Sequence, residues 1–169
     1  MTKIIITLED GREMRATLDE KTAPISCENF LKYVDDGFFS GVIFHRVIPG
    51  FMIQGGGFEP AGKGLSPKDG KYAPIKGEFQ INGIKNDIKH TPGTLSMART
   101  NDPNSATSQF FICVDDCSFL DKQYAGFGSL DDEESLRVAI DISNVSTHNW
   151  QYFGDIPDSP IIIKSIKRV

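Results

Sequence analysis

The chain is poor in several features that would point to a function directly. Its 169 residues include 3 cysteines, 3 histidines and 1 tryptophan, and no apolar run approaches the roughly 20 residues that cross a bilayer. No serine or cysteine occupies the nucleophile elbow of a hydrolase. A small, odd number of cysteines also favours reduced thiols over a disulfide framework. These absences argue against a transmembrane protein, a disulfide-rich secreted domain and a hydrolase.

The charge balance argues against a further class of partner. The 23 acidic and 18 basic residues give a formal net charge of -5, and the isoelectric point is near 5.2. Electrostatically driven binding to nucleic acid or to an anionic membrane is therefore not expected. The start, Met1–Gly11, has too short an apolar stretch for a signal peptide. We expect a cytoplasmic protein with one globular domain over residues 1–169.

Three sequence features that could suggest metal binding, nucleotide binding or acid–base catalysis do not support these functions. Cys113 and Cys117 have no further cysteine or histidine nearby in sequence, so no metal site is expected. The segment Gly57–Gly64 resembles a phosphate loop, but Gly64 stands where magnesium binding needs a serine or threonine, and no helix follows. His45 lies in an apolar, strand-like segment, where a hydrogen-bonded core histidine is expected rather than a catalytic base.

Alternation and helical periodicity predict a mainly β chain with helical caps. Lys3–Leu8 and Arg12–Leu18 alternate around a turn and predict a hairpin. A helix is predicted from Pro24 to Gly37 with Thr22 as its cap, and a second within Ser129–Ser143. Further strands are predicted at Val42–Val47, Met52–Gln54, Thr94–Met97, Gln109–Val114 and Pro160–Val169. With Gly55–Gly77 and Arg99–Ser108 as irregular segments, the pattern predicts an antiparallel barrel or sandwich.

Polar side chains stand among apolar ones in two of these segments. Arg46 and Gln54 lie an even number of positions apart and would face the same side of one extended strand, although Pro49 and Gly50 must bend it. Gln109 and Phe111 share a face in the same way. A concave apolar surface with a few fixed polar groups is typical of a ligand site. The alternative, that these aromatic residues simply form the core, is favoured by pattern alone.

Three long blocks of sequence resemble a known family. The segments "FHRVIPGFMIQGG", "GTLSMARTNDPNSATSQFFI" and "FLDKQYAGFG" are similar to the signature blocks of the cyclophilins, which are peptidyl-prolyl cis-trans isomerases. The resemblance runs from the opening hairpin to Gly128 and includes the last strand, and it is nearer to bacterial-type members. It implies an eight-stranded antiparallel closed β-barrel capped by two α-helices, with the site on the outer face. It also implies an isomerase of X-Pro bonds that assists protein folding, without cofactor or metal.

The resemblance assigns roles to individual positions. Arg46 corresponds to the catalytic arginine, and Gln54 to the glutamine near the substrate backbone. The pocket for the proline ring corresponds to Phe51, Met52, Phe111 and Leu120. The edge that pairs with the peptide corresponds to Ala98, Arg99 and Thr100, with Gln109 beside the neighbouring pocket.

The sequence departs from the animal cyclophilins at two site positions and in one region. Phe119 replaces a tryptophan, and Tyr124 replaces a histidine. Since phenylalanine has no N–H to donate, we expect only weak binding of the inhibitor cyclosporin. The family pattern is also lost from Ser129 to about Ser159.

Two functions from different classes are consistent with these residues. The first is an active isomerase acting on proline-containing peptides and on unfolded or folding proteins. The second is a binding module that holds proline peptides without useful turnover. The intact set of site residues favours the enzyme, and we expect it to be a monomer.

Overall fold

The computed structural model describes residues 1–169. Its helices are α1 (Pro24–Asp35) and α2 (Glu133–Ser143), with short 3-10 turns η1 (Gln80–Asn82) and η2 (Ser118–Leu120). No helix combines the length and apolar character needed to span a membrane. The strands, in chain order, are β1 (Lys3–Leu8), β2 (Glu13–Leu18), β3 (Phe44–Ile48), β4 (Met52–Gly55), β5 (Phe58–Ala61), β6 (Gly64–Pro67), β7 (Thr94–Met97), β8 (Phe110–Cys113), β9 (Gly126–Leu130), β10 (Thr147–Trp150), β11 (Phe153–Pro157) and β12 (Ile163–Arg168).

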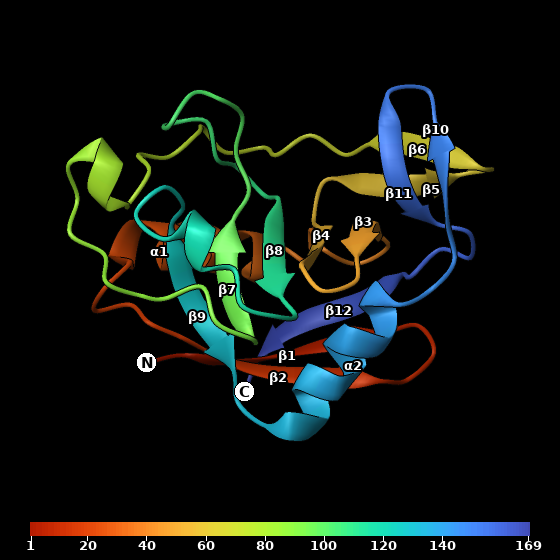
Figure 1. Cartoon of the computed structure of the whole chain (residues 1–169), viewed down its shortest axis with the longest axis horizontal. Coiled ribbons are helices and arrows are strands. Elements are labelled where there is room, and N and C mark those ends of the chain that lie inside the picture. The colour runs from red at the N-terminus through yellow and green to blue at the C-terminus, as the bar shows by residue number, and fades with distance from the viewer.

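Eight strands form one antiparallel sheet in the order β12-β1-β2-β9-β7-β8-β4-β3, which curls around the core with the two helices packed outside it (Figure 1). The expected fold is confirmed, but the expectation of a fully closed barrel was too strong. The edge strands β12 and β3 do not pair along their length. The segments around them are joined by an isolated bridge between Ile43 and Ile162 and by three main-chain hydrogen bonds, from Ile163 N to Val42 O, from Gly41 N to Ile163 O and from Phe44 N to Ile161 O.

The main apolar core lies inside the curled sheet and is closed at one end by α1. Phe30 of α1 is buried, with its ring 5.1 Å from Phe39, 5.3 Å from Phe110 and 5.2 Å from Phe127. Full burial of such a side chain contributes about 3 kcal/mol. At the opposite side of the sheet, α2 packs on β2. This core is what fixes the strands whose outer faces carry the site.

Local predictions are confirmed where the pattern was strong and wrong in particular details. The hairpin β1–β2 forms as expected, and α1 starts at Pro24. Thr22 is not its cap, because its N–H and hydroxyl bind the Asp19 carboxylate, while Ala23 takes the cap position without a side-chain hydrogen bond. The segment 55–77, predicted to be irregular, contains the hairpin β5–β6. A further hairpin, β10–β11, follows α2 in the region without a family pattern.

Candidate active site

Arg46 and Gln54 meet across the hairpin β3–β4. They are cross-strand partners, since Gly50, with a φ of 72°, turns the chain between the strands. They do face the same side, but as partners in a ladder rather than along one strand. The Nη1 atom of Arg46 donates to Oε1 of Gln54 at 3.4 Å, and Nε2 of Gln54 donates to Oε1 of Gln109 at 3.1 Å. This relay of amides holds the guanidinium from one side.

An apolar pocket forms because β8 is apolar on both faces and β4 carries Met52 on its outer face. Phe110 and Ile112 point into the main core, whereas Phe111 and Cys113 belong to a second cluster on the outer face. Strand β8 therefore reads as a continuous apolar run, because its side chains are buried on both faces. The second cluster has as buried members Met52, Phe111, Cys113 and Cys117, with Ile48, Phe51, Ala98, Leu120 and Tyr124 packed against them.

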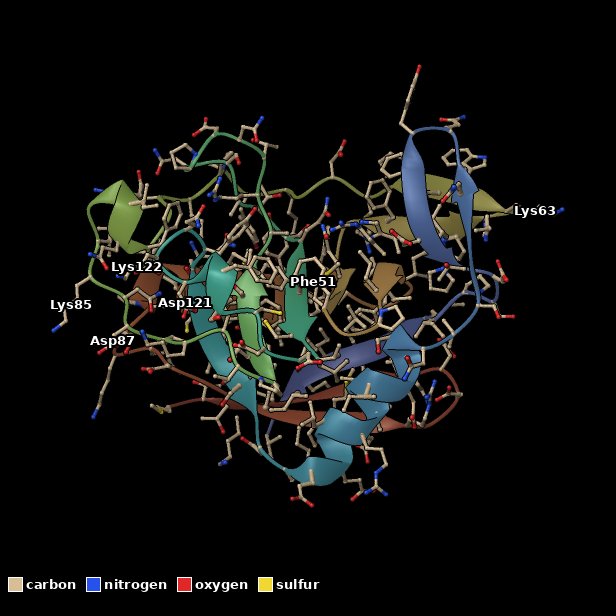
Figure 2. All side chains as sticks on the ribbon, in the orientation of Figure 1. Phe51, Lys63, Lys85, Asp87, Asp121 and Lys122 are labelled. Atoms are coloured by element: carbon tan, nitrogen blue, oxygen red, sulfur yellow. The ribbon has the colours of Figure 1, made fainter.

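The pocket and Arg46 share one open cavity of about 420 Å³. All the predicted site residues line it except Thr100 and Phe119. Phe119 lies just outside, 62% exposed, with its ring 5.5 Å from that of Phe51; Phe51 is labelled near β8 and β4 in Figure 2. The lining residues are His45, Arg46, Phe51, Met52, Gln54, Phe58, Ala98, Arg99, Gln109, Phe111, Leu120, Tyr124, Tyr152, Phe153 and Gly154.

Within the predicted peptide-pairing edge of Ala98, Arg99 and Thr100, the main-chain groups differ in whether they are already hydrogen-bonded. Ala98 N–H donates to Gln109 O, and Thr100 N–H donates to Oγ of Ser105. Arg99 alone has a main-chain N–H and C=O with no hydrogen bond inside the protein. Main-chain groups of this kind can pair with an extended peptide.

The Arg99 side chain braces the pocket wall. Its guanidinium lies 4.8 Å from the Phe79 ring and 4.5 Å from the Tyr124 ring, and Nη2 donates to Gln123 O at 2.7 Å. Stacking of this type favours arginine over lysine. Tyr124 is thereby held against Phe111, 5.8 Å away in an edge-to-face arrangement.

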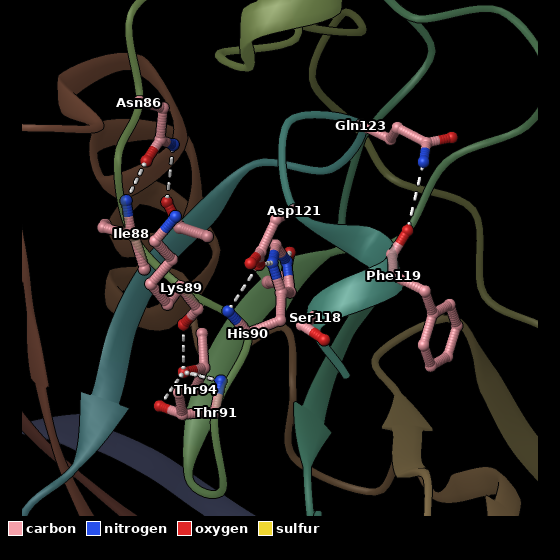
Figure 3. A network of polar contacts seen from close by, with 12 residues as sticks. Asn86, Ile88, Lys89, His90, Thr91, Thr94, Ser118, Phe119, Asp121 and Gln123 are labelled. Atoms are coloured by element: carbon pink, nitrogen blue, oxygen red, sulfur yellow. Dashed lines mark hydrogen bonds and ion pairs between the residues drawn. The ribbon is translucent and has the colours of Figure 1, made fainter. Parts of the chain in front are cut away.

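His90 fixes the loop that carries Phe119 and Leu120. Its main-chain N–H and its ring Nδ1 both donate to Oδ1 of Asp121, at 2.7 and 2.9 Å (Figure 3). Its Nε2 accepts from the Ser96 hydroxyl at 2.9 Å. The arrangement resembles a hydrolase triad, but Ser96 is buried and cannot reach a substrate. Because burial lowers the pKa of His90 despite the Asp121 carboxylate, the ring is neutral and structural.

His45 and the cysteines provide no acid, base or nucleophile. His45 is buried as predicted, at 4% exposure, but Nδ1 has no hydrogen-bond partner, so the expected hydrogen-bonded histidine is wrong. Burial, with the charge of Arg46, lowers its pKa to about 4. All cysteines are free, and burial raises the pKa of the Cys27 thiol to about 12 and raises those of Cys113 and Cys117. No group of His, Cys, Asp and Glu side chains is arranged to hold a metal ion.

Sequence reasoning missed one wall of the cavity. Phe58 comes from β5, and Tyr152, Phe153 and Gly154 come from the hairpin β10–β11. No local signal marks these residues, because the hairpin lies in the region where the family pattern is lost and reaches the site only through tertiary packing. Gly64, which stands where a phosphate loop needs a serine or threonine, leaves room for the Trp150 ring of this hairpin, but the sequence alone gives no sign of that contact.

A curled antiparallel sheet with two helices and an arginine beside an outer-face pocket defines a class of β-barrel-like proteins with a ligand site on the outer face. The chain belongs to one family of that class, because the model for "Cyclophilin type peptidyl-prolyl cis-trans isomerase/CLD" matches residues 3–168. Members of this family are cofactor-independent enzymes that catalyse proline cis-trans isomerisation.

Individual relatives agree with this assignment. The chain is 43% identical to peptidyl-prolyl cis-trans isomerase A of Dickeya dadantii, over 98% of this chain and 84% of that one. It is 44% identical to peptidyl-prolyl cis-trans isomerase B of Escherichia coli, over 89% of each. Among solved structures, a cyclophilin-type isomerase of Cryptosporidium parvum has a TM-score of 0.76 at 31% identity, covering 99% of this chain and 97% of that one. The same parasite protein was also solved in the presence of the dipeptide Ala-Pro, with a TM-score of 0.74 at 32% identity over 98% and 97%.

Proposed function

We propose that residues 1–169 form a single isomerase domain that accelerates rotation about X-Pro bonds in peptides and folding proteins, with Arg46 as the catalytic residue. One observation carries the proposal. Arg46 has no carboxylate partner among the salt bridges of the chain and instead lies on the rim of an apolar pocket, held by Gln54. A half-buried charge placed in this way is available to a substrate.

The reaction needs only a selectively stabilised transition state. Amide resonance gives the peptide bond a rotation barrier of about 18–20 kcal/mol, and uncatalysed X-Pro exchange takes tens to hundreds of seconds. In the twisted transition state the prolyl nitrogen loses conjugation and regains a lone pair. A hydrogen bond from Arg46 to that nitrogen is stronger there than in the planar ground state, which is the condition for catalysis. The permanent charge and rigid donors of arginine suit this role.

The remaining site residues confine rotation to one bond. In the proposed complex the proline ring enters the pocket of Phe51, Met52, Phe111 and Leu120. Gln54 and the free main-chain groups of Arg99 hold the substrate backbone, and Gln109 shapes the neighbouring pocket. A rate gain of about 10⁵ requires about 7 kcal/mol of transition-state stabilisation. One charged hydrogen bond, desolvation and positioning together are of this size.

Three further assignments follow as part of the proposal. The substrates are proline-containing segments, which is supported by the relative solved with Ala-Pro. Cyclosporin binds weakly, because Phe119 offers no N–H beside the pocket. The protein works as a monomer in the cytoplasm, where its free thiols, Cys27, Cys113 and Cys117, stay reduced.

The test is an isomerisation assay by NMR exchange on an Ala-Pro peptide, which needs no helper protease. Arg46→Ala is expected to lower kcat/KM by at least about tenfold, or about 1.4 kcal/mol of transition-state stabilisation. Peptide affinity should fall less, because the proline pocket is unchanged. Equal turnover by the wild type and Arg46→Ala would overturn the assignment of Arg46. Binding without turnover by the wild type would instead identify a binding module.

A further inference from the structure

The wall missed by sequence reasoning extends the cavity beyond Arg46. It consists of Phe58 from β5 with Tyr152 and Phe153 from the hairpin β10–β11, and is called here the aromatic wall. Tyr152 is fully exposed and Phe153 is exposed as well. Figure 1 shows the hairpin standing beside β5 and β6, above β3. Large apolar side chains that remain exposed at the rim of a cavity indicate a contact surface for a ligand.

An unbroken row of rings links the aromatic wall to the catalytic strand. His45, next to Arg46 on β3, lies 4.5 Å from the ring of Phe58. Phe58 meets Phe153 edge to face at 5.3 Å, and Phe153 stacks on Trp150 at 6.3 Å. The wall is therefore continuous with the proposed proline site rather than a separate patch.

The hairpin is fixed in place by its polar contacts and by a glycine. His148 on β10 bonds through Nε2 to Lys63 O at 2.7 Å and through Nδ1 to Asp158 at 2.8 Å; Lys63 marks the tip of β5–β6 in Figure 2. A Cβ on Gly64 would lie 2.2 Å from the Trp150 ring, so the indole sits directly on the β6 backbone. The hairpin backbone and the Phe153 ring are therefore preorganised for binding, whereas Tyr152, at the turn, is fully exposed and held by no side-chain contact.

The turn of the hairpin keeps a costly backbone conformation. Trp150 pairs with Phe153, which leaves Gln151 and Tyr152 as the connection, and Gln151 has a φ of 53°. Asp155, just after the turn, has a φ of 59°. Non-glycine residues rarely adopt this region, and such conformations concentrate at binding and active sites.

The topology indicates which part of a substrate reaches the wall. The strand order β7-β8-β4-β3 places the free main-chain groups of Arg99, after β7, at one side of the pocket. The aromatic wall lies at the other side, because β11 packs against β3. Three strand spacings amount to about 15 Å, which about four extended residues span. A polypeptide paired with Arg99 and with its proline in the pocket therefore continues onto the wall.

We propose that the aromatic wall is a subsite for a bulky apolar side chain of the client polypeptide, aromatic or branched aliphatic. This side chain lies within a few residues of the proline, on the side opposite the residues that pair with Arg99. The inference rests on the proposed function, since its occupant is the same chain whose proline is isomerised. It assigns Tyr152 and Phe153 to substrate preference and not to the chemistry of rotation.

The experiment measures kcat/KM by NMR exchange for a peptide Ala-Ala-Ala-Pro-Ala-Ala-Ala and for variants with phenylalanine at one flanking position. The wild type is expected to prefer phenylalanine over alanine by about fivefold at one or two positions on one side of the proline, because an aromatic ring becomes partly buried. Tyr152→Ser, at a fully exposed position that is free to change without unfolding, should reduce that ratio. The double variant Tyr152→Ser/Phe153→Ser should bring it to about one.

A matched control separates a subsite from general surface stickiness. Ile81 is also a large exposed apolar residue, at 71% exposure, but lies on η1 outside the cavity. Ile81→Ser should leave the phenylalanine preference at the wild-type value. Wild-type turnover with no preference at any position, or a preference that survives in the double variant, overturns the subsite alone. No turnover of any peptide overturns the proposed function instead.

Discussion

Arg46 and Gln54 face each other across the β3–β4 hairpin, with Nη1 of the arginine 3.4 Å from Oε1 of the glutamine. Gln54 is held in turn by Gln109, so the amide is oriented before any substrate arrives. No carboxylate neutralises Arg46, although its neighbours on β3 and β4 are largely apolar. The guanidinium is therefore not part of a structural ion pair, and its remaining donors are free for a substrate.

The first prediction concerns this contact. Gln54→Leu removes the amide with little change in volume, and we expect kcat/KM to fall about fivefold, since one long hydrogen bond to a charged group is lost. Arg46→Lys should fall at least about tenfold, because an ammonium lacks the planar set of donors. Because Gln54 positions Arg46 as well as holding the substrate backbone, the double variant should lose less than the product of the two single losses. Fully additive losses, measured by NMR exchange, would contradict the coupling.

The second prediction concerns inhibitor binding. Phe119 lies beside Phe51 at the mouth of the pocket, where an indole N–H would reach solvent and ligand. Phe119→Trp is expected to tighten cyclosporin binding by about tenfold, the value of one well-placed hydrogen bond of about 1.4 kcal/mol. Turnover of an Ala-Pro peptide should change little. If calorimetric titration finds the wild type binding as tightly as the variant, the missing donor is not the cause of weak binding.

Much of the fold was predictable because its strongest signals are local. The hairpin β1–β2 alternates cleanly and α1 has a clear apolar period, and both were found within a residue or two. Strand β8 was also predicted, but both of its faces are apolar. Its sequence pattern therefore could not show which side chains face the core and which face the site. Phe110 and Phe111 are both buried, one inside the curled sheet and the other in the outer pocket. Pattern alone favoured a core here, and only the family resemblance indicated a pocket.

The aromatic wall was not predictable for a different physical reason. Its side chains come from β5 and from a hairpin far along the chain, and they meet only because Phe153 packs on Phe58 and His148 bonds to Lys63 O. Contacts of this kind leave no periodic trace in either segment. Gln151 also has a positive φ without being glycine, so the tight turn lacks the usual Asn-Gly or Gly signal.

The third prediction concerns the pH dependence of stability through His148. Both of its ring nitrogens face acceptors, so both bonds form only with the protonated ring. The Lys63 carbonyl and then the Asp158 carboxylate raise the pKa of His148, while the nearby Lys63 charge opposes them. Because the folded pKa is raised, this stabilisation is fully present below the unfolded value of about 6.5 and is lost as pH rises through the folded value.

The measurement compares thermal unfolding of the wild type and His148→Gln at about pH 6 and about pH 8.5, on either side of the expected titration. At the lower pH we expect the wild type to unfold at a higher temperature than His148→Gln. At the higher pH this difference in unfolding temperature should be smaller. The comparison also cancels His45 and His90, whose lowered pKa values act in the opposite direction, by destabilising the fold as pH falls. The same difference in unfolding temperature at both pH values would show that the two hydrogen bonds of His148 do not depend on protonation of its ring.

The last prediction separates catalysis by Arg46 from any general acid–base mechanism. His45 is the histidine that lines the cavity, and its burial lowers its pKa to about 4. His90 is neutral and bound to Asp121 and Ser96. A peptide amide does not change charge near neutral pH, and arginine side chains in general are not deprotonated in proteins. On a short, neutral Ala-Pro peptide, kcat/KM should therefore be nearly flat between about pH 6 and 8.5, where an imidazole base of pKa near 6.5 would produce a clear limb. NMR exchange measures this without a helper protease. A tenfold rise across the window, abolished by His45→Gln in a folded protein, would make His45 the base and leave Arg46 with a binding role only.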